Sequence, residues 1–283
     1  MPTVKQWWNW FRSLSGGPRR RGFWALAAAV LSAVPALCLG AVARPCPISS
    51  PNPALAKFNR AITFYLGFDH LPLIADMSDG NGQPAVAKGA VVLKAGLCGH
   101  ALLTPESPVN WDAVSYQARH NVNLSRPGAL AVWISAYHWR RHKKQVPYLF
   151  FLTVRDHGRV LTLARMGTPA NREIVYAYAG LEGKVDCAEQ GNSLRWQTGQ
   201  WHLLVANWRS ESLQFSLDGQ PPVQVNLAAT GFPNAHGPPG HLNIHPLAPN
   251  QRCLLDELLV FNRPLAPKEI RWLYQHGLRR PNR

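Results

Sequence analysis

Two adjacent acidic residues, Asp256 and Glu257, interrupt the apolar stretch CLLDELLVF near the C-terminus. Sandwich-type retaining glycosidases use two carboxylates about 5 Å apart on one face. Consecutive residues of a regular strand point to opposite faces, so this pair cannot form such a dyad by itself. We therefore predict structural roles for both residues. One of them should receive a hydrogen bond or salt bridge from a neighbouring loop, with Arg263 as the natural candidate.

Nucleophilic chemistry is not indicated either. The eleven histidines are scattered, and no Gly-x-Ser-x-Gly elbow is present. Acidic residues are scarce, 15 in 283, and no Glu-x-Asp-x-x-Glu arrangement supplies a second carboxylate. We predict that the chain is not an enzyme and has no catalytic residues.

Oxygen donors gather in the segment DHLPLIADMSDGNGQ, residues 69–83. Calcium takes hard oxygen ligands from turn-rich loops, although the twelve-residue loop with a closing Glu is missing here. Asx-turns made by solvated side chains are the ordinary alternative. No cofactor is required by the sequence, and calcium is the one for which it offers ligands: Asp69, Asp76, Asp79 and Asn81.

Aromatic and basic side chains occur together in YHWRRHKK, residues 137–144. Aromatic rings pack against the faces of sugar rings, and the basic groups favour an anionic ligand, whether a glycan, a lipid or a protein. The ligand-binding residues that we predict are Tyr137, Trp139, Arg140, Arg141, Trp111 and Trp208. We assign Trp133 and Trp201 to the core, because they lie in the strongest strand patterns.

The chain carries 30 Lys and Arg against 15 Asp and Glu, for a net charge of +15. Such a surface favours anionic partners, and general solubility is the alternative explanation. The export signal described next argues against nucleic acid as the partner.

Three arginines at 19–21 precede an apolar run over residues 22–43. Its length lies between that of a signal-peptide core and that of a membrane span. Ala41-Val42-Ala43 fits a signal peptidase site, whereas the Trp-rich segment 1–21 favours an anchor with a cytoplasmic N-terminus. We predict export, with the chain either anchored in the inner membrane and facing the periplasm or secreted after cleavage behind Ala43.

Four cysteines follow the apolar run. In an oxidising compartment they allow three pairings, among which the sequence does not choose. One or two structural disulfides are expected from Cys46, Cys98, Cys187 and Cys253.

A proline-rich linker, residues 44–61, leads into a region of short runs rich in β-branched and aromatic residues. The predicted strands are 61–68, 128–137, 147–154, 159–164, 173–180, 201–208, 213–217, 223–227, 241–244 and 253–261. So many strands with one helical pattern predict a two-layer sandwich over residues 62–275. A β-propeller is the alternative, but no repeat of blade length is present.

The hairpin at 212–227 is the clearest of these patterns. Leu213, Phe215 and Leu217 alternate with polar residues, and Asp218-Gly219 predicts a tight turn. Pro221-Pro222 then predict a sheet edge or a bulge.

The helical pattern begins at Pro267, which suits the first position of a helix, and Gly277 suits its end. Ile270, Leu273 and Tyr274 share one face, so we expect the helix to pack on the sheet. Residues 276–283 form a basic tail.

Five weak motifs in order resemble the laminin-G-like, concanavalin A-like domains of exported bacterial proteins. They are FYLGFDH…ADMSDGNGQ at 64–83, AGLCGHALLT at 95–104, GALAVWISA at 128–136, GQWHLLVANW…LQFSLDGQPP at 199–222, and the closing DELLVFNRPL…EI at 256–270. The resemblance implies an all-β, two-sheet antiparallel jelly-roll sandwich with a short C-terminal helix, here preceded by an N-terminal hydrophobic signal or anchor helix. The insertion at 105–127, the four cysteines and Pro267 depart from the family pattern.

Members of that family bind saccharides or proteins at a sheet face or loop rim, sometimes through calcium. The resemblance therefore implies a non-catalytic binding module for a glycan or protein partner. A structural accessory subunit of a larger inner-membrane assembly, held by the N-terminal helix, is the alternative.

Overall fold

The computed structural model describes residues 56–87, 91–104, 114–137, 149–167, 173–181, 184–190, 196–227, 240–245 and 252–277. The predicted signal or anchor segment at 22–43 and most of the proline-rich linker lie outside these residues. Within them, no helix has the length and hydropathy needed to cross a bilayer.

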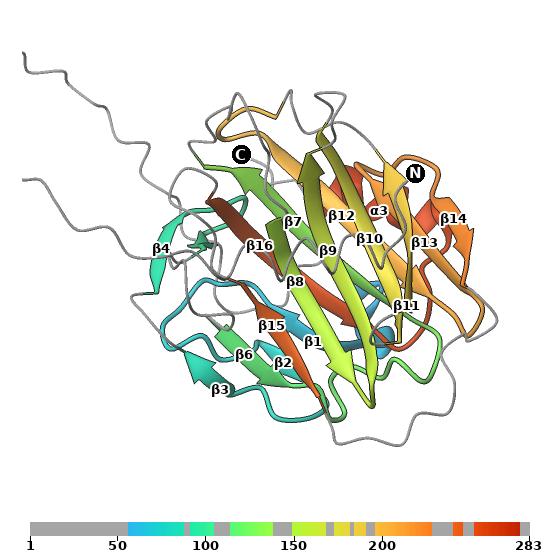
Figure 1. Ribbon diagram of the computed structural model, residues 1–283. Helices are drawn as coiled ribbons and strands as arrows, with labels where there is room; N and C mark the ends of the chain where they lie inside the picture. The colour runs from blue at the N-terminus through green and yellow to red at the C-terminus, as the bar shows by residue number, and fades with distance from the viewer. Residues whose placement is uncertain are drawn as a thin grey trace, which may run out of the picture. The chain divides into compact units, whose positions relative to one another are not determined.

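Two antiparallel sheets lie face to face (Figure 1). The first has the order β14-β13-β12-β7-β16-β1-β2, with β5 also pairing with β16 and β4 with β5. Its strands are β1 (Ile62–Leu66), β2 (Met77–Ser78), β4 (Val92–Ala95), β5 (His100–Leu103), β7 (Gly128–Ala136), β12 (Trp201–Trp208), β13 (Ser212–Leu217), β14 (Val223–Asn226) and β16 (Cys253–Phe261).

The second sheet has the order β11-β10-β9-β8-β15-β6-β3. Its strands are β3 (Pro84–Ala87), β6 (Val114–Gln117), β8 (Leu149–Asp156), β9 (Arg159–Gly167), β10 (Glu173–Leu181), β11 (Lys184–Gln190) and β15 (His241–Ile244). A short 3-10 helix, η1 (Asn59–Ala61), precedes β1, and the helix α3 (Pro267–Gly277) follows β16.

The main core lies between the sheets. On β7, Leu130, Val132 and Ile134 face inward and pack with side chains of the opposite sheet such as Leu161 and Leu163. Alternate positions of a strand share a face, so these residues form the inner layer.

The outer face of β7 is covered as well, which explains why β7 and β16 are apolar at nearly every position. Trp133 and Leu203 pack there with Ile270 and Leu273 of α3. The ring of Trp133 stacks on Tyr274, with centroids 5.8 Å apart. The predicted helix, its apolar face and the core assignment of Trp133 are thus confirmed, while Trp201 is half-buried between two apolar clusters.

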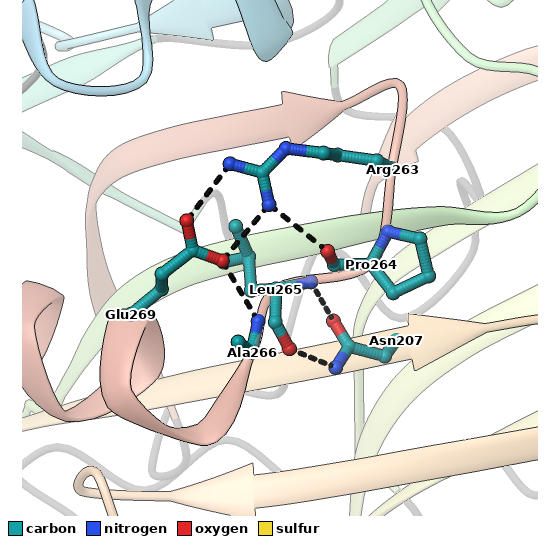
Figure 2. A network of polar contacts seen from close by, with 6 residues as sticks. All are labelled: Asn207, Arg263, Pro264, Leu265, Ala266 and Glu269. Carbon is teal, nitrogen blue, oxygen red and sulfur yellow. Dashed lines mark hydrogen bonds and ion pairs between the residues drawn. The ribbon is translucent and has the colours of Figure 1, made fainter.

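Polar contacts fasten the connection between β16 and α3 (Figure 2). Asn207 of β12 donates to the carbonyl of Leu265 at 2.8 Å and accepts from its N–H at 3.0 Å. Glu269 accepts two bonds from the guanidinium of Arg263, each 2.8 Å, and one from the N–H of Ala266. Arg263 therefore pairs with Glu269, and its predicted role as partner of Asp256 or Glu257 is wrong.

The hairpin prediction is confirmed. Leu213, Phe215 and Leu217 are buried, and Asp218 and Gly219 both take positive φ in the turn. β14 is the edge strand of its sheet, as the two prolines before it indicated. The ten predicted strands correspond to β1, β7, β8, β9, β10, β12, β13, β14, β15 and β16.

The structure contains strands that the patterns did not predict. β6 lies inside the segment 105–127 that looked like an insertion, and β11 follows β10 with a polar sequence, KVDCAEQ. Short polar strands carry little periodic signal, because pairing with their neighbours decides their conformation.

Candidate functional site

A β-bulge interrupts β16 at Asp256 and Glu257. One edge of β16 pairs first with β5, at Leu254 and Leu255, and then with β1, from Leu258 onward. Between these two pairings the register with β7 shifts, and Glu257 takes a φ of 51°. The bulge thus lies at a seam where two strands share one edge of a third.

Asp256 caps the backbone at this seam. Its Oδ2 accepts hydrogen bonds from the N–H groups of Leu97, at 2.7 Å, and Cys98, at 3.3 Å, while Oδ1 accepts from Glu257 N at 2.9 Å. A Cβ on Gly96 would lie 2.6 Å from Asp256 Oδ2, so this close approach requires glycine. The predicted hydrogen bonds from a neighbouring loop are confirmed.

Two of the predicted calcium ligands act as caps in the same region. Asp69 Oδ1 accepts from the N–H of His100, and Asp76 Oδ2 accepts from the N–H of Gly67, each at 2.8 Å. The Asp69 bond fastens the loop after β1, residues 67–76, to His100 at the start of β5, which follows the loop 96–99, and the Asp76 bond closes the 67–76 loop on itself. We call these two loops the rim.

The other two predicted ligands lie apart from these caps. Asn81 Oδ1 accepts from Gln83 N at 2.9 Å, which is an Asx-turn. Asp79 N donates to the carbonyl of Thr63. Over the part of the chain that the structure describes, no group of three or more His, Cys, Asp or Glu side chains is arranged to hold a metal ion. Asp69, Asp76 and Asn81 thus act as loop caps, and calcium binding stays a prediction.

Burial and mutual repulsion raise the pKa of the seam carboxyl groups. Burial raises the pKa of Asp256 well above its ordinary range, and the charge of Glu257 raises it further. Burial also raises the pKa of Glu257, with smaller contributions from Asp69 and Asp76, while a hydrogen bond from the Tyr65 hydroxyl opposes the shift.

Asp256 and Glu257 are closed to substrate, with exposed fractions of 0% and 4%. A glycosidase pair must reach a bound sugar, so this pair is unsuited to that chemistry. The premise of a regular strand, from which we expected opposite-facing side chains, is wrong at this position because of the bulge. The structural assignment holds for a different reason, which is burial and backbone capping.

The aromatic and arginine residues that we predicted to bind a ligand fall into three groups. Trp208 lies in the core with 1% exposed, and its Nε1–H donates to the carbonyl of Arg126 at 2.7 Å, so no ligand reaches its ring and its predicted binding role is wrong. Tyr137, just after β7, is half-buried and packs against the apolar cluster of Ala101, Leu103 and Leu254. The remaining residues, Trp111, Trp139, Arg140 and Arg141, lie outside the described residues.

One of the four predicted disulfide cysteines departs from the prediction. Cys253 is a free thiol in the core, and burial raises its pKa. Cys98 is disulfide-bonded. The side chains of Cys46 and Cys187 lie outside the described part of the chain, so the pairing stays open.

The rim presents two apolar side chains that the sequence reasoning missed. Leu71 is 57% exposed and Ile74 is 43% exposed. Between them Leu73 is buried, and its carbonyl accepts a hydrogen bond from the hydroxyl of Tyr116 at 2.8 Å. In the sequence, these two side chains belong to the apolar run LPLI, residues 71–74, between the acidic residues Asp69 and Asp76. That run was the available signal for an exposed apolar loop. A loop fixed by caps, with apolar groups facing solvent, is suited to binding, because little conformational entropy is lost when a ligand docks.

No protein-family model matches the chain, and a search of curated proteins found no match. The predicted laminin-G-like family is therefore not confirmed.

The fold is similar to that of several solved structures, each far from this chain in sequence. The binding domain of botulinum neurotoxin DC in complex with SialylT has 11% identity and a TM-score of 0.59, over 78% of this chain and 52% of that one. The same domain in complex with rat synaptotagmin II has 12% identity and a TM-score of 0.59, over 79% and 53%. The receptor binding domain of botulinum neurotoxin D has 11% identity and a TM-score of 0.60, over 77% and 53%.

This chain spans about half the length of those receptor-binding domains. At such identity the likeness shows the fold alone. The chain has a two-sheet antiparallel β-sandwich of a kind that occurs in receptor-binding domains.

Proposed function

We propose that the chain is a non-catalytic module that binds a glycan or protein ligand. The observation that carries the proposal is the likeness of its fold to receptor-binding domains, one solved with SialylT and another with synaptotagmin II. The burial of the one adjacent carboxylate pair supports binding without chemistry.

The ligand contacts that we propose come from two parts of the chain. The first is the rim, where Leu71 and Ile74 are exposed on a loop fixed by Asp69 and Asp76. The second is the sequence segment 137–144, in which Tyr137 and Trp139 stand beside Arg140 and Arg141. Aromatic and Arg side chains are enriched at binding hot spots, and the charge suits an anionic ligand.

We also propose that the chain is exported and held at the membrane by the apolar run 22–43. This arrangement would place the sandwich on the far side of the membrane, where nucleic acid is not a partner. Blotting the exported form for its size tests the anchor, and a mature form that lacks residues 1–43 would contradict it.

A glycan array and a mild-detergent purification of the full chain test the binding role together. We expect a glycan to be retained on the array or a protein ligand to copurify, and we expect Leu71→Ser with Ile74→Ser, or Trp139→Ala with Arg140→Ala, to weaken that retention. Val223→Ser is the matched control, because Val223 is 40% exposed on the edge strand β14. Stoichiometric copurification of a membrane assembly with no glycan retained would favour an accessory subunit instead.

A further inference from the structure

A basic groove lies beside η1, away from the rim. Residues 56–61 and 262–263 line it, and its volume is about 510 Å³. The two segments are fastened together, because Asn262 N donates to the carbonyl of Ala61 at 2.8 Å. The walls of the groove are therefore fixed.

Three cations and no carboxylate line the groove among the described residues: Lys57, Arg60 and Arg263. Arg263 is neutralised by its bidentate pair with Glu269. The ammonium of Lys57 lies 4.6 Å from the ring centroid of Trp272, and its charge helps to lower the pKa of Glu269, whose carboxylate is already paired with Arg263. Arg60 is exposed, and its guanidinium makes no hydrogen bond or ion pair in the described structure.

The flanking segments of the given sequence add no acidic side chain. Residues 1–55 contain no Asp or Glu, and neither do residues 278–283. Lys268 and Arg271 add two more exposed cations on α3, the helix that carries Trp272 and Glu269. Among the described residues, Glu269 is the carboxylate that pairs with a cation of the groove, so the positive charge there exceeds the negative charge beside it.

We propose that this groove binds the phosphate of an anionic phospholipid headgroup. A groove of this size accommodates a headgroup, and basic side chains near a bilayer are attracted to anionic lipid. The choice of lipid over a soluble phosphate rests on the proposed anchor. The run 22–43 ends 14 residues before Lys57, a span of at most about 50 Å when extended.

The reactivity of Lys57 measures occupancy of the groove in the full chain. The chain is reconstituted in nanodiscs of neutral phosphatidylcholine, or of phosphatidylcholine mixed with phosphatidylglycerol, and acetylated with an N-hydroxysuccinimide ester. Mass spectrometry then gives the acetylation rate at each lysine. We expect anionic lipid to slow acetylation of Lys57 about fivefold relative to neutral lipid. Lys94, on β4 near the opposite end of β16, is the internal reference and should change less than twofold.

Arg60→Glu should abolish the protection of Lys57, because it replaces the unpartnered cation with a repelling charge. Lys94→Glu is the charge-matched control and should leave the protection intact. Since the Arg60 side chain makes no contact that folding requires, a folded Arg60→Glu protein is expected, and Arg60→Gln should give an intermediate result. Equal acetylation of Lys57 in both lipids would overturn the proposal.

Two further arms identify the source of the anion. Full protection by inorganic phosphate in neutral nanodiscs would overturn the assignment to lipid, and so would protection by an acidic glycan but not by anionic lipid. Loss of the anchor would appear separately, as failure of the chain to stay with neutral nanodiscs. Loss of glycan or protein binding at the rim would leave the Lys57 result unchanged.

Discussion

At the scale of single residues, a fully buried carboxylate costs free energy unless donors surround it. Asp256 meets this condition with backbone N–H groups from Leu97, Cys98 and Glu257. The first two belong to the loop before β5, where the seam leaves the backbone without strand partners. The Asp256 side chain thus accepts hydrogen bonds from backbone N–H groups that in an uninterrupted sheet would pair with a neighbouring strand.

Replacing Asp256 should therefore destabilise the fold in a graded way. Asp256→Ala leaves the Leu97 and Cys98 amides without an acceptor, and we expect it to cost about 1–3 kcal/mol of unfolding free energy. Asp256→Asn keeps one acceptor oxygen and removes a buried charge beside Glu257, so it should cost less. Urea unfolding measures both. Equal losses for the two variants would mean that capping is not the role of this residue.

The pH dependence of stability follows from the raised pKa of Glu257. Burial raises the pKa of Glu257 from 4.5 to about 7, so the folded chain binds more protons in this range, and the contribution of Glu257 to stability falls as pH rises from 4.5 through about 7. Asp69, Asp76, Asp256 and the Tyr65 hydroxyl face Glu257 at the seam. We expect unfolding free energy to fall between about pH 4 and pH 8, and to fall less in Glu257→Gln. A variant profile parallel to that of the wild type would contradict this assignment.

At the scale of elements, α3 is fastened to the sheet by two kinds of contact (Figure 2). Asn207 makes a buried reciprocal pair with Leu265, whereas Arg263 meets Glu269 at the exposed side. Glu269 also accepts from Ala266 N at the helix start, which is half of a capping box, since Ala266 has no side-chain acceptor to complete it. The helix that begins at Pro267 has no polar side chain at the position before it, Ala266, and the bond to Glu269 compensates in part.

These two contacts should differ in energy and in response to salt. Asn207→Ala leaves the buried N–H and carbonyl of Leu265 without hydrogen-bond partners. We expect it to lower the free energy of unfolding by about 2–3 kcal/mol. Arg263→Ala breaks an exposed ion pair and should cost about 0.2–1 kcal/mol, a loss that salt diminishes. Urea unfolding at low and high NaCl checks both variants. A larger loss of unfolding free energy for Arg263→Ala than for Asn207→Ala would contradict our assignment of the Asn207–Leu265 pair as the stronger contact.

The elements also show what the sequence could predict. Alternation identified the hairpin at Leu213, Phe215 and Leu217 because one face of that strand is buried. The bulge at Asp256 was not predictable, since it arises where β1 and β5 meet on the same edge of β16 and those strands are distant in sequence. Trp208 was misassigned for a similar reason. A Trp at the end of a strand can face a ligand or the core, and tertiary packing decides which.

At the scale of the whole molecule, the sandwich carries its candidate surfaces on separate elements. The rim stands at the seam of β16, and the basic groove lies beside η1 and the segment that leads into α3. The net charge of +15 favours anionic partners for the whole chain. The adjacent carboxylates Asp256 and Glu257 are buried and belong to the exposed groups of neither surface.

The most direct test of this account is equilibrium binding of the full chain to an array-selected glycan or a copurified ligand, followed by mass analysis of the recovered ligand. We predict saturable binding, a ligand of unchanged mass, and an affinity that weakens as NaCl rises, because the attraction involves a net charge of +15. A ligand recovered in cleaved form would contradict the non-catalytic assignment, and the absence of any saturable ligand would contradict the binding role.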